Sequence, residues 1–224
     1  MGTSGWSYKE WVGLLYPSGT TASGMLTAYA ERFSTVEAHN TFRRRPRTPT
    51  LEAWARTVPP TFRFALKAHV AITHQRELDG VEARIENFFD SLAPLGPLVG
   101  AVLFQLPHRE PDLDRLDRLL AALPPSPPAA FELGPAWNRA DVLERLDGAG
   151  ATLVVVDKDG EEPALPEAGG LTYLRLRRES YDDDAIARWA RRLTDVARSG
   201  RPAFVFLRHE GDPLEAVRLS SALD

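Results

Sequence analysis

The sequence predicts an α/β fold, a single TIM (β/α)8 barrel formed by residues 1–224. Eight short β-rich segments recur along the chain, and amphipathic helical patterns separate most of them. Several segments are almost continuously apolar, such as 101–104 and 153–156, which is typical of parallel strands covered on both faces. Alternation of this kind indicates a parallel sheet, and 224 residues over eight units give 28 residues each, at the short end of the barrel range.

Each expected strand is a short apolar run bounded by polar or turn-forming residues. The eight runs span residues 1–6, 33–40, 62–69, 100–106, 129–133, 151–157, 171–177 and 202–209. A doubly wound sheet is the alternative, and it usually carries a glycine-rich phosphate loop after its first strand. Neither G-x-G-x-x-G nor G-x-x-x-x-G-K-[ST] occurs in this chain, so the barrel is preferred.

Amphipathic helices are expected between most of the strands. Apolar residues recur at helical spacing over 81–92 and over 186–197, so each segment has one face that can cover the sheet. Three aspartates at 182–184 place negative charge at the start of the seventh helix. Gly200 follows the end of that helix, where a left-handed residue commonly stops it.

Proline and glycine mark two more helix starts and one missing helix. Thr48-Pro49 and Asp212-Pro213 each look like an N-cap residue followed by proline at the first helical position. Residues 158–170 are acidic and contain proline and glycine, so they cannot hold a full helix. We therefore expect an irregular or missing helix after the sixth strand.

Composition limits the classes of function. A net charge of −4 argues against general binding of nucleic acid, which usually requires a basic surplus. The chain has no cysteine, which excludes disulfides, zinc–cysteine sites and thiol catalysis. Only three of its 27 basic residues are lysine, namely Lys9, Lys67 and Lys158.

The sequence also gives no sign of a membrane or secretory protein. No apolar run approaches the roughly 18 residues that a membrane-spanning helix needs. Residues 1–6 lack both the basic and the apolar parts of a signal peptide. We expect a cytoplasmic protein that makes no membrane contact.

Seven segments in order resemble one known family. They are GTSGWSY at 2–8, VEAHNTF at 36–42, FALKA at 64–68, LFQLP at 103–107, YLRLR at 173–177, FVF at 204–206 and HE at 209–210. They are similar to the strand motifs of the YecE-like family, a domain-of-unknown-function family of TIM-barrel proteins. The resemblance covers the chain from residue 2 onwards, and it implies the barrel fold but no particular reaction.

The chain departs from the family pattern at three places. Members usually have an Arg-His pair between a glutamate and a tryptophan, where this chain has ELGPAW at 132–137. Many members have tyrosine where this chain has Arg43. If the missing pair takes part in the family's chemistry, this member is altered or inactive. Relatives usually carry a few residues before the first strand, so a start upstream of Met1 would lengthen that strand.

The active site of a TIM-barrel enzyme lies at the C-terminal ends of the strands, and Lys67 is the strongest candidate there. A half-buried ammonium is costly unless it is paired or used, and burial lowers its pKa. Lys67 could therefore act as an electrophile, a Schiff-base lysine or an anchor for a phosphate or carboxylate. The structural alternative is a salt bridge, with Glu37 on the neighbouring strand as the expected partner.

Carboxylates at the strand ends are the other catalytic candidates. Glu37 and Glu132 could form a pair for acid/base work, with Asp157 as a further candidate. Alternatively, one carboxylate orients Lys67 and another holds a loop. The same three side chains could bind a divalent metal with His39, His69 and His209. A nearby lysine opposes a cation, so no cofactor is expected and a metal is the minor alternative.

Polar and aromatic residues around the same strand ends are expected to bind substrate. They are Trp6, Tyr8, Asn40, His69, His74, Gln105, Trp137, Arg175, Arg177 and His209. Aromatic side chains there could stack on a ligand, although capping the core is their commoner role. The arginine-rich loop at 43–47 could steer a small anion.

These candidates favour a soluble enzyme that acts on a small polar, anionic metabolite at the barrel mouth. Lys67 would be the central cation, Glu37 its partner or a general base, and Glu132 and Asp157 further acid/base groups. A non-catalytic small-molecule binding barrel and a metal-dependent hydrolase or isomerase are the alternatives. The sequence does not give the substrate, the reaction or the oligomeric state.

Overall fold

One eight-stranded parallel sheet forms the centre of the computed structural model, which describes residues 1–75, 79–107, 110–166, 170–208 and 210–223. Its strands are β1 (Gly2–Thr3), β2 (Thr35–Ala38), β3 (Arg63–Lys67), β4 (Val99–Gln105), β5 (Ala129–Glu132), β6 (Thr152–Asp157), β7 (Thr172–Leu176) and β8 (Ala203–Leu207). Neighbouring strands pair in the order β1-β8-β7-β6-β5-β4-β3-β2, so the sheet follows the chain around its circumference. The predicted TIM-like barrel is confirmed.

The barrel closes between β1 and β2 just beyond the end of β1. Ser4 forms an isolated parallel bridge with Glu37, and the backbone amide of Gly5 donates to the carbonyl of Glu37 at 2.9 Å. Nearer the start of the strands, the Tyr29 hydroxyl accepts from the amide of Thr3 at 2.7 Å and donates to the carbonyl of Thr35 at 3.1 Å. One phenol therefore replaces the ladder hydrogen bonds that the two-residue strand β1 does not make.

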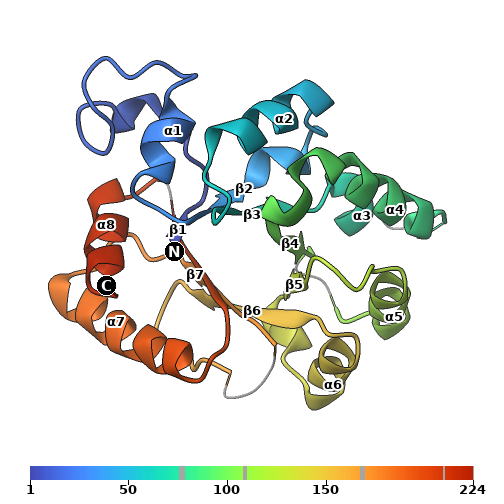
Figure 1. Cartoon of the computed structure of the whole chain (residues 1–224). Coiled ribbons are helices and arrows are strands. Elements are labelled where there is room, and N and C mark those ends of the chain that lie inside the picture. Colours follow the sequence, from blue (N-terminus) through green and yellow to red (C-terminus); the bar gives the residue numbers. More distant parts are fainter. Residues whose placement is uncertain (76–78, 108–109, 167–169, 209, 224) are drawn as a thin grey trace.

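Helices surround the sheet as an outer ring (Figure 1). They are α1 (Met25–Ala30), α2 (Thr48–Thr57), α3 (Val70–Thr73), α4 (Val81–Ser91), α5 (Leu113–Ala121), α6 (Ala140–Gly148), α7 (Asp183–Arg198) and α8 (Pro213–Ser221), with short 3-10 helices η1 (Lys9–Trp11), η2 (His39–Phe42), η3 (Ala93–Leu98) and η4 (Pro135–Trp137). The described residues between β6 and β7, 158–166 and 170–171, contain no helix, as predicted. Within the described segments, every helix is too short or too polar to cross a lipid bilayer.

Strand alternation divides the apolar residues between two cores. Side chains such as Phe64, Leu66 and Phe104 face the helices and belong to the large outer core. A second cluster fills the barrel interior, and it consists of Ala65, Ala101, Leu103, Ala130, Val154, Leu171, Tyr173 and Phe206. Alanines on β3, β4 and β5 leave the space that the aromatic rings from β7 and β8 occupy.

Close packing near the bottom of the barrel requires a glycine. Gly100 lies where the pairing of β3 with β4 shifts register. A Cβ atom at Gly100 would lie 2.5 Å from the Phe204 ring and 2.9 Å from the Cβ of Arg63. Any larger residue at this position would therefore force the ring or the strand to move.

The helix termini confirm the predicted cap Asp212, correct the predicted cap Thr48, and show that Asp182, predicted only as a negative charge at the helix start, also caps its helix. Asp212 and Asp182 accept hydrogen bonds from the first turns of α8 and α7, at 2.9 Å and 2.8 Å. Thr48, the predicted N-cap of α2, instead begins that helix. Arg47 is its N-cap because the amides of Thr50 and Leu51 bond to the carbonyl of Arg47 and close the first turn there.

The second strand ends earlier than predicted, and the difference positions part of the mouth. Residues 39 and 40 were expected in the strand but lie in η2. The Thr41 hydroxyl lies within hydrogen-bond distance of the carbonyls of Ala38 (3.0 Å) and Lys67 (2.6 Å), so it fixes this turn against β3. His39, Asn40 and Phe42 are thereby held over the end of the barrel.

Replacing Leu103 by alanine should destabilise the barrel because it empties part of the closed interior. Leu103 is fully buried, whereas Leu14 is 59% exposed and provides the same substitution on the surface. We expect Leu103→Ala to lower the free energy of unfolding by about 2–5 kcal/mol. Leu14→Ala should change it by less than about 0.5 kcal/mol. Urea denaturation measures both, and equal effects would contradict this packing.

Candidate functional site

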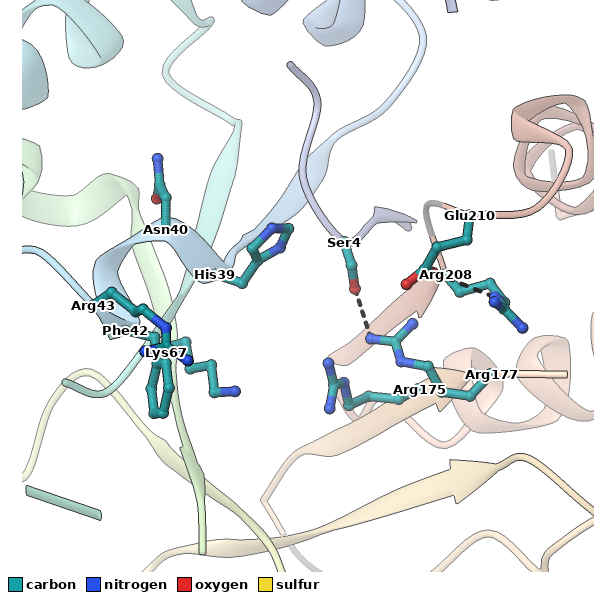
Figure 2. A pocket seen from close by; sticks show the side chains of 10 residues that line it. All are labelled: Ser4, His39, Asn40, Phe42, Arg43, Lys67, Arg175, Arg177, Arg208 and Glu210. Carbon is teal, nitrogen blue, oxygen red and sulfur yellow. Dashed lines mark hydrogen bonds and ion pairs between the residues drawn. The ribbon is translucent and has the colours of Figure 1, made fainter. Parts of the chain in front are cut away.

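A cavity of about 430 Å³ opens at the C-terminal end of the strands. Figure 2 shows its lining residues, which are Ser4, His39, Asn40, Phe42, Arg43, Lys67, Arg175, Arg177, Arg208 and Glu210. Lys67 extends into the cavity from one side, and Arg175 and Arg177 extend toward it from the other. Five of these ten side chains are lysine or arginine, and one is a carboxylate.

Glu37 is the fully buried carboxylate beneath this cavity. Its Oε1 accepts hydrogen bonds from Ser4 Oγ (2.6 Å), Arg175 Nη2 (2.9 Å) and Arg177 Nη2 (3.0 Å). Its Oε2 accepts from the Tyr173 hydroxyl at 2.8 Å. The carboxylate therefore connects three strands at the point where the barrel closes.

These partners keep Glu37 ionised. Burial by itself would raise the pKa of Glu37, but the charges of Arg175 and Arg177 and the hydrogen bonds from Ser4 and Tyr173 outweigh it. The pKa of Glu37 falls from 4.5 to about 2. Burial and the adjacent carboxylate raise the pKa of Tyr173 well above its usual value, so this phenol stays a donor. Such a weakly basic carboxylate is suited to holding cations in place and not to accepting a proton.

Arg175 joins the two glutamates of the mouth. Its Nη2 binds Glu37, its Nη1 binds Glu132 Oε2, and its side chain is 12% exposed. Gln105 Nε2 donates to the other oxygen of Glu132 at 2.6 Å. Glu37 and Glu132 thus come together as predicted, but with an arginine between them.

Lys67 ends the same chain of contacts, with neutral groups as its partners. Its Nζ donates to Gln105 Oε1 and lies 4.1 Å from the centre of the Phe42 ring. The expected Lys67–Glu37 salt bridge does not form, and across the described residues no carboxylate oxygen lies within 4.0 Å of Nζ. Arg175 and Arg177 bind the carboxylate of Glu37 instead, because a planar guanidinium group can donate to several acceptors at once.

Burial and the nearby arginines disfavour the protonated form of Lys67. Burial lowers the pKa of Lys67, and the positive charge of Arg175 lowers it further. The carboxylates of Glu37 and Glu132 act in the opposite direction, but the pKa stays below its usual value. Lys67 is therefore a cavity-lining amine that deprotonates more easily than a surface lysine.

Two further arginines extend the positive wall of the cavity. Arg208 pairs with Glu210 at 3.3 Å, so its charge is partly balanced. Arg43 is exposed and lies 5.9 Å from the Phe42 ring, on which Lys67 also packs. In the described part of the chain, Arg43 has no carboxylate within 4.0 Å.

The loop after β1 shapes the rim of the cavity. The Tyr8 hydroxyl donates to the carbonyl of Ser4 at 2.7 Å. Gly5 has a φ of 86°, and a Cβ atom there would lie 2.3 Å from the Tyr8 hydroxyl and 3.0 Å from the His39 ring. Glycine at this position therefore lets Tyr8 and His39 approach the end of β1, and Asn40 lies exposed beside them on η2.

Four other predicted binding residues make structural contacts. Trp6 and Trp137 are buried in the outer core, and Trp6 packs edge-on against Trp54 of α2. His69 caps α3 by accepting the Ala71 amide through Nδ1 at 3.2 Å. His74 contacts the Thr73 hydroxyl at 2.8 Å and the Phe42 ring at 5.1 Å. His209, the last of the predicted set, lies outside the described residues.

Asp157 faces the helices and not the cavity. It is fully buried and accepts from Arg178 Nε (2.8 Å), the Tyr181 hydroxyl (3.1 Å) and Trp189 Nε1 (3.1 Å). Its register partner Leu176 also belongs to the outer core. The preceding residue on β6, Val156, faces the barrel interior. Asp157 therefore connects β6 to α7 and to the loop that precedes α7.

Of the metal ligands considered from the sequence, those that the structure describes do not gather into one cluster. Across the residues that the structure describes, no group of three or more His, Asp or Glu side chains could hold a metal ion. Glu37 is surrounded by cationic donors that would compete with a metal.

Sequence reasoning overlooked several residues of the mouth. Ser4 and Tyr173 bind Glu37, while Phe42 and Glu210 line the cavity. Strand alternation could have found Tyr173, because it is two residues before Arg175 and points to the same side. Ser4 gave no comparable signal, because its role depends on where the barrel closes.

The comparisons with known proteins agree with this architecture. A family model described as "Protein of unknown function DUF72" matches residues 1–224. The UPF0759 protein YunF of Bacillus subtilis strain 168 is 32% identical over 113 residues, a match that covers 48% of this chain and 39% of YunF. This chain therefore aligns with well under half of that relative's length.

Two solved structures share the fold. A DUF72 family protein of Thermotoga maritima MSB8 superposes with a TM-score of 0.83 at 23% identity, covering 99% of this chain and 97% of the other. A DUF72 family protein of Enterococcus faecalis V583 gives a TM-score of 0.73 at 20% identity, covering 91% and 95%. At these identities the likeness shows the fold alone.

Glu37→Gln should destabilise the protein because it leaves two arginines without their shared carboxylate. We expect a loss of about 3–5 kcal/mol at neutral pH. Glu52→Gln, on a side chain that is 49% exposed, should change stability by less than about 1 kcal/mol.

The destabilisation by Glu37→Gln should depend on pH. Because the pKa of Glu37 is lower in the folded state, its ionised carboxylate contributes its full share of the folding stability above about pH 4.5. This contribution is lost as the pH falls toward about 2. The difference between the wild type and Glu37→Gln should therefore shrink over this window in urea denaturation. A constant difference would show that Glu37 does not act through its charge.

Asp157→Asn should weaken the fold without affecting the cavity. We expect the free energy of unfolding to fall by about 1–3 kcal/mol, because a buried acceptor of three donors is altered. Asp195→Asn, on a side chain that is 74% exposed, is the matched control. Calorimetric titration with inorganic phosphate should give the same affinity for the wild type and both variants. Lost affinity in a fully stable Asp157→Asn protein would return Asp157 to the site.

Proposed function

The chain belongs to the DUF72 family of proteins of unknown function, and we propose that it is an enzyme acting on a small anionic metabolite at the barrel mouth. One observation carries the proposal. Lys67 and Arg43 both lie over the Phe42 ring at the cavity, and neither has a carboxylate within 4.0 Å in the described segments. Arg175, Arg177 and Arg208 have carboxylate partners, so the unbalanced positive charge belongs to these two residues.

Unbalanced charge in a partly enclosed cavity favours an anionic ligand. A carboxylate or phosphate there would gain charge-assisted hydrogen bonds in surroundings less polar than water. The cavity volume of about 430 Å³ lies within the usual range for small-molecule sites. A small metabolite fits this volume better than a polymer does.

The residues of the mouth divide into contact and positioning roles. Lys67 is the central cation, and Arg43, Asn40 and Arg208 lie where they can contact the ligand. Glu37 positions Arg175 and Arg177, since its low pKa makes it a poor general base at neutral pH. Glu132 positions Gln105 through a hydrogen bond and Arg175 through an ion pair.

A non-catalytic binding protein is the second candidate. Its support is that both mouth glutamates are already engaged by arginine or glutamine, which leaves neither as an evident proton acceptor. The two candidates differ in what happens to a bound ligand: an enzyme consumes it, and a binding protein returns it unchanged.

Calorimetric titration tests the anion site. Inorganic phosphate and small phosphorylated or carboxylated metabolites should bind the wild type, and neutral sugars should not. Lys67→Met and Arg43→Gln should each weaken binding by about 10- to 100-fold, which corresponds to a lost charge-assisted hydrogen bond. Arg56→Gln, on α2 with a 71% exposed side chain, should leave it unchanged.

Two further readouts decide between the candidates. Product analysis by mass spectrometry after prolonged incubation separates turnover from simple binding. If Lys67→Met loses stability while the folded protein keeps its affinity for anions, Lys67 is structural and the proposal fails.

A further inference from the structure

We propose that Lys67 is a nucleophile that forms an imine with an aldehyde or ketone carrying a carboxylate or phosphate group. This inference rests on the proposed anion site and names the class of substrate that the site would take. Its basis is the position of Nζ on the cavity surface between two neutral groups, Gln105 and the Phe42 ring.

The side-chain amide of Gln105 lies between the amine of Lys67 and the carboxylate of Glu132. Its amide oxygen accepts from Lys67, while its amide nitrogen donates to Glu132 at 2.6 Å. A carboxylate in the place of Gln105 would form a salt bridge with Lys67 and hold it as an ammonium. The amide instead orients the amine and leaves its charge unmatched.

The arginines complete this arrangement. Arg175 and Arg177 occupy the carboxylate of Glu37, and Arg175 also occupies that of Glu132. Burial and the charge of Arg175 then lower the pKa of Lys67, which increases the fraction of neutral amine. The Phe42 ring opposes this effect because its face attracts the ammonium form of Lys67.

The chemical step needs no group beyond the protein and the substrate. The lone pair of neutral Nζ attacks the carbonyl carbon, and the electron pair of the C=O bond moves to oxygen. One Nζ proton is transferred to that oxygen, which gives a carbinolamine. Its hydroxyl takes up a proton from solvent and leaves as water while the nitrogen lone pair forms the C=N bond, and the resulting protonated imine keeps the second Nζ proton. Arg175 and Arg177, on the opposite wall, can stabilise the oxygen while it carries negative charge.

The acidic group of the substrate has its own place in the cavity. Arg43 also lies over the Phe42 ring, 5.9 Å from its centre, and is exposed at the rim. An anion held there places the rest of a small molecule toward Lys67. A protonated imine at Lys67 would then withdraw electrons from the neighbouring carbon, which assists loss of a proton or a carboxylate from it.

Reductive trapping on the intact 224-residue chain tests the imine. Glyoxylate, an anionic aldehyde, is incubated with the wild type at pH 7 and reduced with borohydride, and the modified lysine is located by peptide mass mapping. The chain helps here because it has only three lysines. We expect Lys67 to be modified at least about tenfold faster than Lys158, whose side chain is 70% exposed. Equal rates at Lys67, Lys9 and Lys158 would overturn the proposal.

The Gln105→Glu variant tests whether the neutral amide of Gln105 keeps the pKa of Lys67 low. It should move the pH midpoint for modification of Lys67 by neutral acetaldehyde upward by about one unit or more, and slow the reaction at pH 7 by about tenfold. Lys158 in the same sample is the internal control and should not change. An unchanged pH profile for Lys67 would show that Gln105 has no such role and that the neutral surroundings do not activate the amine.

Titration with phosphate distinguishes the imine proposal from the proposed anion site on which it rests. If phosphate binds the wild type and Lys67 is not trapped, the anion site stands and the imine proposal fails. If phosphate does not bind and acetaldehyde still traps Lys67 selectively, the imine chemistry stands without the anion site. Lys67→Arg should abolish the adduct at this position, and peptide mapping of the wild type tests the imine even if that variant does not fold.

Discussion

The ion pairs of Glu37 with Arg175 and Arg177 are the interaction on which the arrangement of the mouth depends. A fully buried carboxylate is costly unless cations and hydrogen bonds compensate it, and here two guanidinium groups, Ser4 and Tyr173 do so. These contacts join β2 to β7 and to the end of β1, next to the place where the barrel closes. Glu37 therefore takes part both in closing the barrel and in holding the arginines of the mouth.

The same pairing decides which cation remains available. Because arginine binds both glutamates, Lys67 contacts an amide and an aromatic ring instead of a carboxylate. A reversed choice, with Lys67 on Glu37, would have left the guanidinium group of Arg177 without that carboxylate and the amine in an ordinary salt bridge. The observed choice leaves an amine with a lowered pKa on the cavity surface, and both functional proposals start from that amine.

The interior of the barrel supports this layer from below. Small residues on β3, β4 and β5 face the rings of Tyr173 and Phe206, so the space beneath the mouth is filled with apolar side chains. Tyr173 belongs to this packing and also donates its hydroxyl to Glu37. A well-packed interior of this kind restricts the positions of the charged side chains above it.

The sequence by itself determined the barrel, the order of its strands, the weak sixth unit and the gathering of Lys67, Glu37, Glu132, Arg175 and Arg177 at one end. These features follow from local apolar patterns and from the rule that parallel strands share a C-terminal edge. The tertiary structure alone decided the partners: Glu37 binds an arginine 138 positions away and not Lys67 on the next strand. It also turned Asp157 toward α7 and placed Trp137 in the outer core. Partner choice depends on side-chain reach and direction across the closed barrel, which no local pattern encodes.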